Sequence, residues 1–413
     1  MRDFLRRGAR AAFDVTHGIY RLSRAPKPTS NFAMTVDEDD LATARLWLAK
    51  KDQWSDRSSV QQYERAFALW NGSQHAFAFQ AGRKALSACI YALELKEGDE
   101  VIMPGFTCVL LPNAFEFQGV KVVFCDIELD TYGPDLKSIE ARISTRTRAI
   151  VVQHLFGIVC RDYEKIVSLA NRNNLHVIED CAQSTGASLD GKKVGTRGTV
   201  GFYSSERSKV FSTVIGGVAV TDRAEVAKRL QFCSENWKVP SEHDIEKQLQ
   251  NVRLDYYRFK HPMAPVLFPV INLFNGAASI TNMMPDEMLG RVPQDYYARM
   301  PAPIAALGLN QLQKIDSYNA ARRVAAARWD QWCGNHGYKR PLVLPGSTPV
   351  FLRYPILVEP ERKADVRWAR DELGVELGVW FKTNVHPTAR LVEGCPNADL
   401  AVERCVNFPT LLN

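Results

Sequence analysis

The sequence predicts an α/β protein in which a mainly parallel sheet is covered by helices and a smaller α+β domain follows it. Short apolar runs alternate with segments of helical periodicity from about Trp70 to Val220, and this pattern is typical of a parallel sheet covered on both faces. After Gly337, the strand-like run VFLRYPILV precedes the helix-like run RKADVRWARDELG. The chain has 413 residues, more than the roughly 250–300 that one hydrophobic core usually holds.

The strands of the predicted sheet come from short apolar runs bounded by turn residues. These runs are HAFAFQ, DEVIMPG, KVVFCDI, RAIVVQHLFG, LHVIEDCA, TVGFYS and GGVAVTD. Segments between them, such as AGRKALSACIYALELKEGD and DYEKIVSLANRNN, have helical spacing. Later in the chain, PIAALGLNQLQKIDSYNAARRVAAARWDQW predicts a long helix.

The chain is predicted to have four parts. Residues 1–28 form a basic helix with a linker, and residues 29–250 form the large domain that holds the sheet. Residues 251–298 are an inserted segment, in which prolines interrupt the apolar runs too often for a long helix. Residues 299–413 contain the long helix and the small domain.

Composition excludes several classes of protein. The net charge is +6, the basic residues are spread along the chain, and no zinc-finger or RNA-binding signature is present, so nucleic acid is not an expected partner. The nine cysteines form no CxxC pair, which predicts reduced core thiols, no metal site and a cytoplasmic location. No apolar run reaches the roughly 20 residues that span a bilayer.

The N-terminal stretch differs from the rest of the chain. MRDFLRRGARAAFDVTHGIYRLSR contains six arginines, no lysine and two acids. Such a helix can lie on an anionic membrane surface, so peripheral membrane contact through residues 1–25 is one interpretation. A solvated N-terminal helix explains the same pattern.

Polar residues follow several of the predicted strands. Gly82 and Arg83 begin a helix after one strand, while His154, Asp180 and Ser204 end three others. In open parallel sheets, ligands bind beyond the carboxyl ends of the strands. We therefore expect these residues to line a binding site.

One lysine completes a chemical set with these residues. Asp180 ends a buried strand, where a carboxylate is costly unless it meets a cation such as a protonated pyridine nitrogen. Lys209 alone would be interpreted as a surface lysine, but in a cation-rich pocket its amine becomes a Schiff-base nucleophile. Gly82, Arg83 and Ser204 offer a helix N-terminus, a guanidinium and a hydroxyl to a phosphate. Together these groups suit pyridoxal 5′-phosphate.

The residue spacing in this region resembles that of a known family. VIEDCAQSTGASLDGKKVGTRGTVGFYSSERSKVFSTVIGGVAV is similar to the pattern E-D-A-A-Q, G-x-x-x-G, S-F-x-x-x-K and G-G of the DegT/DnrJ/StrS sugar aminotransferases, which have fold-type I architecture. The resemblance covers roughly residues 35–245 and 295–390. The matched positions are Asp180, Gln183, Gly191, Gly195, Ser204, Lys209, Gly216 and Gly217.

The resemblance implies a role for each matched residue. Asp180 would pair with the pyridinium nitrogen, and Gln183 would lie near the ring. Ser204 would contact the phosphate, and Lys209 would hold the cofactor covalently and then move the proton. The implied reaction transfers an amino group from an amino acid, glutamate, to a nucleotide-activated ketosugar, and the implied assembly is a homodimer.

Three positions depart from the family pattern. Arg83 stands where the family has Thr or Ser, and we expect it to bind the phosphate, with a surface salt bridge as the alternative. Cys108 stands where an aromatic residue stacks on the ring. Tyr297, in DYYARM, stands where the partner subunit's asparagine reaches the phosphate. Tyr297, His386 and His154 are the candidate substrate residues, and His154 could equally be a core histidine.

Two other functions remain open from the sequence. One is different pyridoxal-phosphate chemistry, such as dehydration or transamination of a non-sugar or lipid-linked carbonyl. The family's dehydratase replaces the lysine by histidine, so Lys209 argues against that branch. The other is a non-catalytic relative that acts as a binding subunit.

Overall fold

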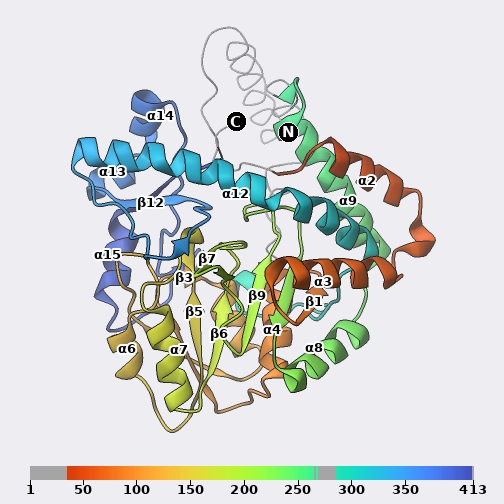
Figure 1. The fold of residues 1–413 in the computed structure, drawn as a ribbon, viewed down its shortest axis with the longest axis horizontal. Helices are drawn as coiled ribbons and strands as arrows, with labels where there is room; N and C mark the ends of the chain where they lie inside the picture. The colour runs from red at the N-terminus through yellow and green to blue at the C-terminus, as the bar shows by residue number, and fades with distance from the viewer. Residues whose placement is uncertain (1–34, 265–266, 268–284, 412–413) are drawn as a thin grey trace, which may run out of the picture.

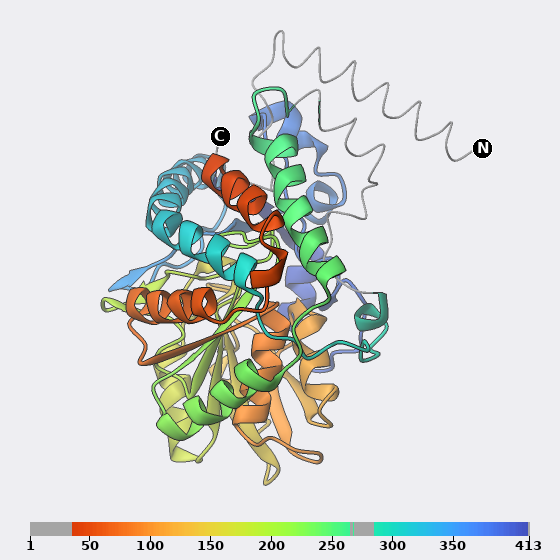
Figure 2. The ribbon, with the colours of Figure 1, turned by 90° about the vertical axis from the view of Figure 1, so that its right-hand side faces the viewer.

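The computed structural model describes residues 35–264, 267 and 285–411. Helices cover both faces of a central sheet, and a smaller domain packs beside its upper end (Figures 1 and 2). The predicted fold class is therefore confirmed. The predicted helix and linker over residues 1–28, and the membrane contact through residues 1–25, lie outside the described residues.

The central sheet has seven strands, and each of them overlaps one of the seven predicted runs; six lie wholly within their runs, and β5 begins one residue earlier, at Thr147. Six strands run parallel, whereas β10 is antiparallel to both of its neighbours. In spatial order the strands are β1 (His75–Phe79), β10 (Gly217–Thr221), β9 (Val200–Ser204), β6 (His176–Asp180), β5 (Thr147–Gln153), β2 (Glu100–Pro104) and β4 (Lys121–Cys125).

Successive side chains of a strand point to opposite faces of the sheet, so the large domain has two hydrophobic cores. In β5, Ile150 and Val152 face one core, and Ala149 and Val151 face the other. Because both faces of β5 are buried, its middle residues 149–152 are all apolar. The first face is covered by α3 (Ser58–Asn71) and α7 (Tyr163–Arg172), and the second by α4 (Gly82–Ala92), α5 (Leu110–Glu116) and α8 (Ala224–Asn236).

The predicted long helix is α12 (Ala302–His336), and it joins the two domains. Near its start Ile304 packs into the core of the large domain, and near its end Trp329 packs into that of the small domain. It begins after Pro301 and ends at Gly337, whose positive φ of 74° closes the helix. Around it lie α2 (Glu38–Leu48), η1 (Lys51–Gln53), α9 (Glu242–Asp255) and the π-helical η3 (Tyr256–Lys260).

The small domain is built on a two-stranded antiparallel sheet with its own aromatic core. It contains β12 (Tyr354–Leu357), β14 (Cys405–Phe408), α13 (Pro360–Ala364), α14 (Arg367–Leu373) and α15 (Pro396–Arg404). One short pair, β3 (Thr107–Cys108) with β13 (Val385–His386), ties it to the edge of the large sheet. The remaining elements are α6 (Leu136–Glu140), η2 (Leu155–Gly157), α11 (Pro285–Met288), and the strands β7 (Ser188–Leu189), β8 (Lys192–Lys193) and β11 (Ser347–Thr348).

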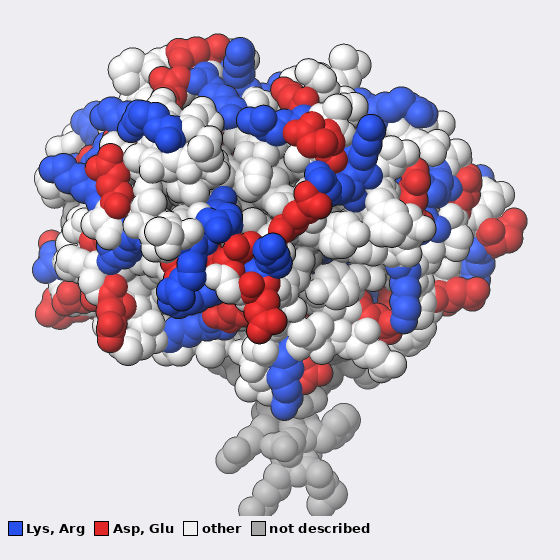
Figure 3. Space-filling view, turned by 90° about the horizontal axis from the view of Figure 1, so that it is seen from below, with Lys and Arg blue, Asp and Glu red and all other residues white. Residues whose placement is uncertain are grey.

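The surface and the helices agree with the composition. On the face seen in Figure 3, acidic and basic side chains are interspersed, without a continuous basic surface. Among the described residues, no helix combines the length and the apolar character that crossing a bilayer requires. The predicted boundaries at residues 250 and 298 stay predictions, and α9 runs through position 250.

Candidate active site

Four predicted site residues from separate segments meet at the carboxyl edge of the sheet. Asp180 is the last residue of β6, and Cys108 ends β3. Burial raises the pKa of the Cys108 thiol, and the charges of Lys209, Asp180 and Arg83 all act on it. Charged residues far apart in the sequence are therefore within electrostatic range of Cys108.

Asp180 is the buried acid of this site, with 7% of its surface exposed. Burial raises its pKa, while the N–H of Ala182, which donates to Oδ1 at 3.0 Å, and the charge of Lys209 oppose that rise. A carboxylate in this position gains stability from any cation that reaches it. It is suited to bind a protonated ring nitrogen.

Gly82 and Ser204 form a close-packed cradle at the start of α4. A Cβ on Gly82 would lie 2.7 Å from the Cβ of Ser204 and 2.9 Å from its Oγ, so only glycine fits. Ala81, the N-cap residue, has no side chain that could cap the helix. The first-turn amides of α4 and the Ser204 hydroxyl are therefore suited to hold an anion.

Lys209 is half-buried in the loop between β9 and β10. Its N–H donates to the carbonyl of Glu206 at 2.9 Å, and its Nζ lies 5.7 Å from the ring centroid of Trp380. The buried Arg322 of α12 donates to the carbonyl of Val210 at 2.7 Å. Contacts on both sides thus hold the backbone that carries the lysine.

Gln183 connects the sheet edge to the small domain. Its Oε1 accepts the N–H of Phe156 at 3.0 Å, and the carbonyl of Phe156 accepts the N–H of Arg353 at 3.3 Å. The buried guanidinium of Arg353 lies 4.4 Å from the ring centroid of Trp380. Burial lowers the pKa of Arg353 to about 10. The ring of Trp380 is therefore close to both Arg353 and Lys209.

His386 is brought to the site by strand pairing. In the pair of β13 with β3, His386 stands opposite Cys108, and its ring stacks on Phe381 at 5.3 Å between centroids. Burial lowers the pKa of His386 to about 4, with the charges of Lys382 and Lys363 adding to the effect. His386 is therefore neutral at pH 7.

The pKa of His386 predicts a defined acid sensitivity. The unfolded chain binds this proton near pH 6.5, whereas the folded protein binds it only near pH 4. Stability from this residue is thus complete above pH 6.5 and is lost as the pH falls to 4. Urea unfolding should show that the free energy of unfolding falls less between pH 7 and pH 4.5 for His386→Gln than for the unchanged protein. The control is His336→Gln, because His336 is exposed. An equal fall in the free energy of unfolding for both variants would contradict the prediction.

His154 lies in the core behind the sheet edge. It is fully buried, its Nδ1 accepts the N–H of Cys160 at 3.1 Å, and its Nε2 faces Glu179 Oε2 at 3.3 Å. Ligand atoms of His154, Glu179 and Cys181 lie within 4.8 Å of one another. However, Glu179 already accepts backbone N–H groups of residues 195, 197 and 198. These are the contacts of a core histidine, and the role of His154 as a substrate residue stays a prediction.

Arg83 and Tyr297 occupy less expected positions. Arg83 forms a buried ion pair with Glu287 of α11. The ring of Tyr297 packs on Trp237 and Tyr296, with centroids 5.1 and 5.2 Å apart. Their predicted roles, a phosphate ligand and a substrate residue, stay predictions.

Four residues near this edge were not predicted: Arg322, Arg353, Trp380 and Glu287. Arg353 could have been identified from the sequence, because a charged residue inside the apolar run VFLRYPILV indicates a buried cation. No motif marks the other three, although Trp380 lies six residues before His386 and Glu287 lies ten residues before Tyr297.

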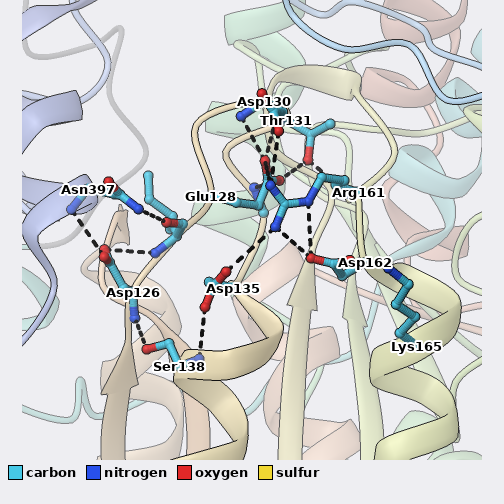
Figure 4. A network of polar contacts seen from close by, with 12 residues as sticks. Asp126, Glu128, Asp130, Thr131, Asp135, Ser138, Arg161, Asp162, Lys165 and Asn397 are labelled. Carbon is cyan, nitrogen blue, oxygen red and sulfur yellow. Dashed lines mark hydrogen bonds and ion pairs between the residues drawn. The ribbon is translucent and has the colours of Figure 1, made fainter.

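A polar network secures the loop that follows β4 (Figure 4). Arg161 pairs with Asp130 at 2.9 Å and with Asp162 at 2.7 Å. Asp126 accepts the N–H groups of Asn397 and Ala398 at 3.1 and 3.0 Å, at the start of α15. The small domain is thereby fixed against the sheet edge.

Comparison with known proteins agrees with this architecture. The profile of the DegT/DnrJ/EryC1/StrS aminotransferase family matches residues 35–413. The GDP-perosamine synthase of Escherichia coli O157:H7 is 36% identical over 202 residues, which are 48% of this chain and 54% of that protein. The L-glutamine:2-deoxy-scyllo-inosose aminotransferase of Streptomyces fradiae is 30% identical over 325 residues, 78% of this chain and 67% of that protein. The match to the E. coli protein thus spans about half of its length.

Solved structures share the fold at low sequence identity. The aminotransferase TlmJ from Streptoalloteichus hindustanus has a TM-score of 0.72 and 21% identity, covering 92% of this chain and 93% of that one. DesV of S. venezuelae, solved with a ketimine intermediate, has a TM-score of 0.70 and 22% identity, covering 90% and 89%. These neighbours have the fold-type I architecture predicted above. With a profile match over nearly the whole chain, this protein belongs to the DegT/DnrJ/EryC1/StrS aminotransferase family.

Proposed function

We propose that this protein is a pyridoxal-phosphate-dependent aminotransferase that moves an amino group from glutamate to a nucleotide-activated ketosugar. The observation that carries the proposal is that Asp180 and Ser204 end the neighbouring strands β6 and β9, while the charges of Lys209, Asp180 and Arg83 all affect the pKa of Cys108. A buried acid, an amine and a guanidinium at one place match the three functional parts of this cofactor.

The residues present fit the cofactor. At the cradle of Gly82 and Ser204, the amides of the first turn of α4, which no N-cap side chain satisfies, and the Ser204 hydroxyl suit its phosphate. Asp180 would accept a hydrogen bond from the ring nitrogen, and Lys209 would bind the aldehyde carbon. When bound, the cofactor supplies an electron sink for the substrate's α-carbon.

The protein's own groups would carry out the remaining work. The amine of Lys209 would act as the base that moves a proton between the substrate's α-carbon and the cofactor carbon. A positioned base speeds such transfers by about 10²–10⁴-fold. Trp380 and Phe381 would keep water from the reacting atoms. His386, neutral at pH 7, would offer a ring nitrogen to the substrate.

The substrate class draws support from the names of relatives. GDP-perosamine synthase names a nucleotide sugar, and the Streptomyces relatives name L-glutamine as donor and an inosose as acceptor. Purified protein should therefore be tested with glutamate and with glutamine against a set of nucleotide ketosugars. Mass spectrometry would detect the aminated product, with Lys209→Ala as the control. A chain without a visible cofactor band would instead be a binding subunit.

A homodimer is part of the proposal, because members of the resembled family build each site from two subunits. In this chain Tyr297 packs on Trp237 and Tyr296, away from the contacts of Lys209. Light scattering at micromolar concentration should give twice the mass of one chain. A fully active monomer would contradict the expectation.

A further inference from the structure

The short helix α11 places the carboxylate of Glu287 against Arg83, the residue that the proposed function assigns to the cofactor's phosphate. Glu287 pairs with Arg83, and the two side chains are 1% and 7% exposed. The segment is anchored on both sides of this pair. The side chain of Asn113 donates to the carbonyl of Glu287 at 2.5 Å, and that of Thr388 donates to the carbonyl of Met288 at 3.1 Å.

Arg83 is the second residue of α4, directly after the glycine of the cradle. Its charge acts on Cys108 within the site and on Tyr296 outside it. A phosphate monoester brings about 1.5–2 negative charges at neutral pH. If it binds at the cradle, it competes with the Glu287 carboxylate for the guanidinium of Arg83.

We infer that Glu287 opposes binding of the cofactor's phosphate, so that Arg83 must exchange its carboxylate partner for the phosphate. This inference rests on the proposed function for the identity of the anion. Glu287 would then set the affinity for the cofactor through its contact with Arg83. Because Glu287 belongs to α11, the affinity would also depend on the position of that helix. Lys84, the next residue, is not the replacement cation, because its amine is already bound to Gln80 and to the carbonyl of Asp295 at 3.2 Å.

The variant Glu287→Gln tests the exchange with little change in shape, since the backbone carbonyl that Asn113 holds remains. Without ligand, this variant should melt at a lower temperature, because it removes the negative charge from a buried ion pair. Its affinity for pyridoxal phosphate and for inorganic phosphate should nevertheless rise about tenfold, as the competing charge is gone. A residue with only a structural role would lower stability without tightening anion binding.

Two matched controls define the site of the effect. Asp286→Asn removes the neighbouring acid, which pairs with Arg291 at the surface at 2.7 Å, and should leave affinity unchanged. In Arg83→Met, phosphate binding should weaken by roughly ten- to a hundredfold, as for loss of a hydrogen bond to a charged group. Adding Glu287→Gln to Arg83→Met should then recover less than the tenfold gain seen alone.

The measurements are cofactor titration by visible absorbance and thermal shift of the cofactor-free protein with inorganic phosphate. Pyridoxal, which lacks the phosphate, should bind both forms equally. Unchanged or weaker phosphate binding in Glu287→Gln would overturn the inference, and so would an equal gain for pyridoxal. If the unchanged protein shows no cofactor band, the proposed function fails. The inference can still be tested in that case, because the titration with inorganic phosphate still reports on Arg83 and Glu287.

Discussion

Lys209→Ala should abolish turnover and the visible absorption band of the bound cofactor while leaving the fold intact. Within the described part of the chain, Lys209 Nζ makes no hydrogen bond or ion pair, and its recorded contact is the Trp380 ring at 5.7 Å. Removing a half-buried amine with so few contacts should change stability by less than about 1 kcal/mol. Loss of proton transfer alone should slow turnover by about 10²–10⁴-fold, and loss of covalent binding adds to it.

The assignment can be checked on the unmodified protein. Borohydride reduction followed by peptide mapping should place the pyridoxyl group on Lys209. Lys192→Ala, on the β7–β8 hairpin, gives a control in which an exposed lysine is removed. A label on another lysine, or a normal band in Lys209→Ala, would contradict the assignment.

The sheet was predictable because its strands are buried on both faces. A parallel sheet covered by helices requires continuous apolar runs, and each of the seven runs became a strand. The direction of β10 was not predictable. A parallel connection needs about a dozen residues or more, and the loop over residues 205–216, which has no helix in it, allows either direction.

The site was predictable only where chemistry follows a strand directly. Asp180 and Ser204 end neighbouring strands, so the topology of the sheet places both residues at the same edge. Trp380 and Glu287 reach the same edge from distant segments through tertiary packing, and no local pattern records that approach. His154 also follows a strand, yet its side chain turns into the core, where Cys160 and Glu179 occupy both nitrogens.

Asp180→Asn should lower turnover by at least roughly a hundredfold, the upper range for losing a hydrogen bond to a charged group. Asparagine keeps the size of the side chain but carries no charge, so it cannot hold a protonated ring nitrogen, and the ring becomes a weaker electron sink. The variant should still bind the cofactor, because the cradle at Gly82 and Ser204 is unchanged.

The stability of this variant separates a chemical role from a structural one. Burial raises the pKa of Asp180 in the folded protein, so the ionised carboxylate costs stability at pH values above its unfolded pKa. A neutral side chain removes that cost, and cofactor-free Asp180→Asn should therefore melt at the same temperature as the unchanged protein or above it at pH 7.

Thermal melts and steady-state rates at saturating cofactor measure the two effects. The control is Asp190→Asn, which removes an acid on the β7–β8 turn. Near-normal turnover in Asp180→Asn would show that the ring nitrogen has another partner. A lower melting temperature with a proportional loss of turnover would show that Asp180 supports the fold instead of the chemistry.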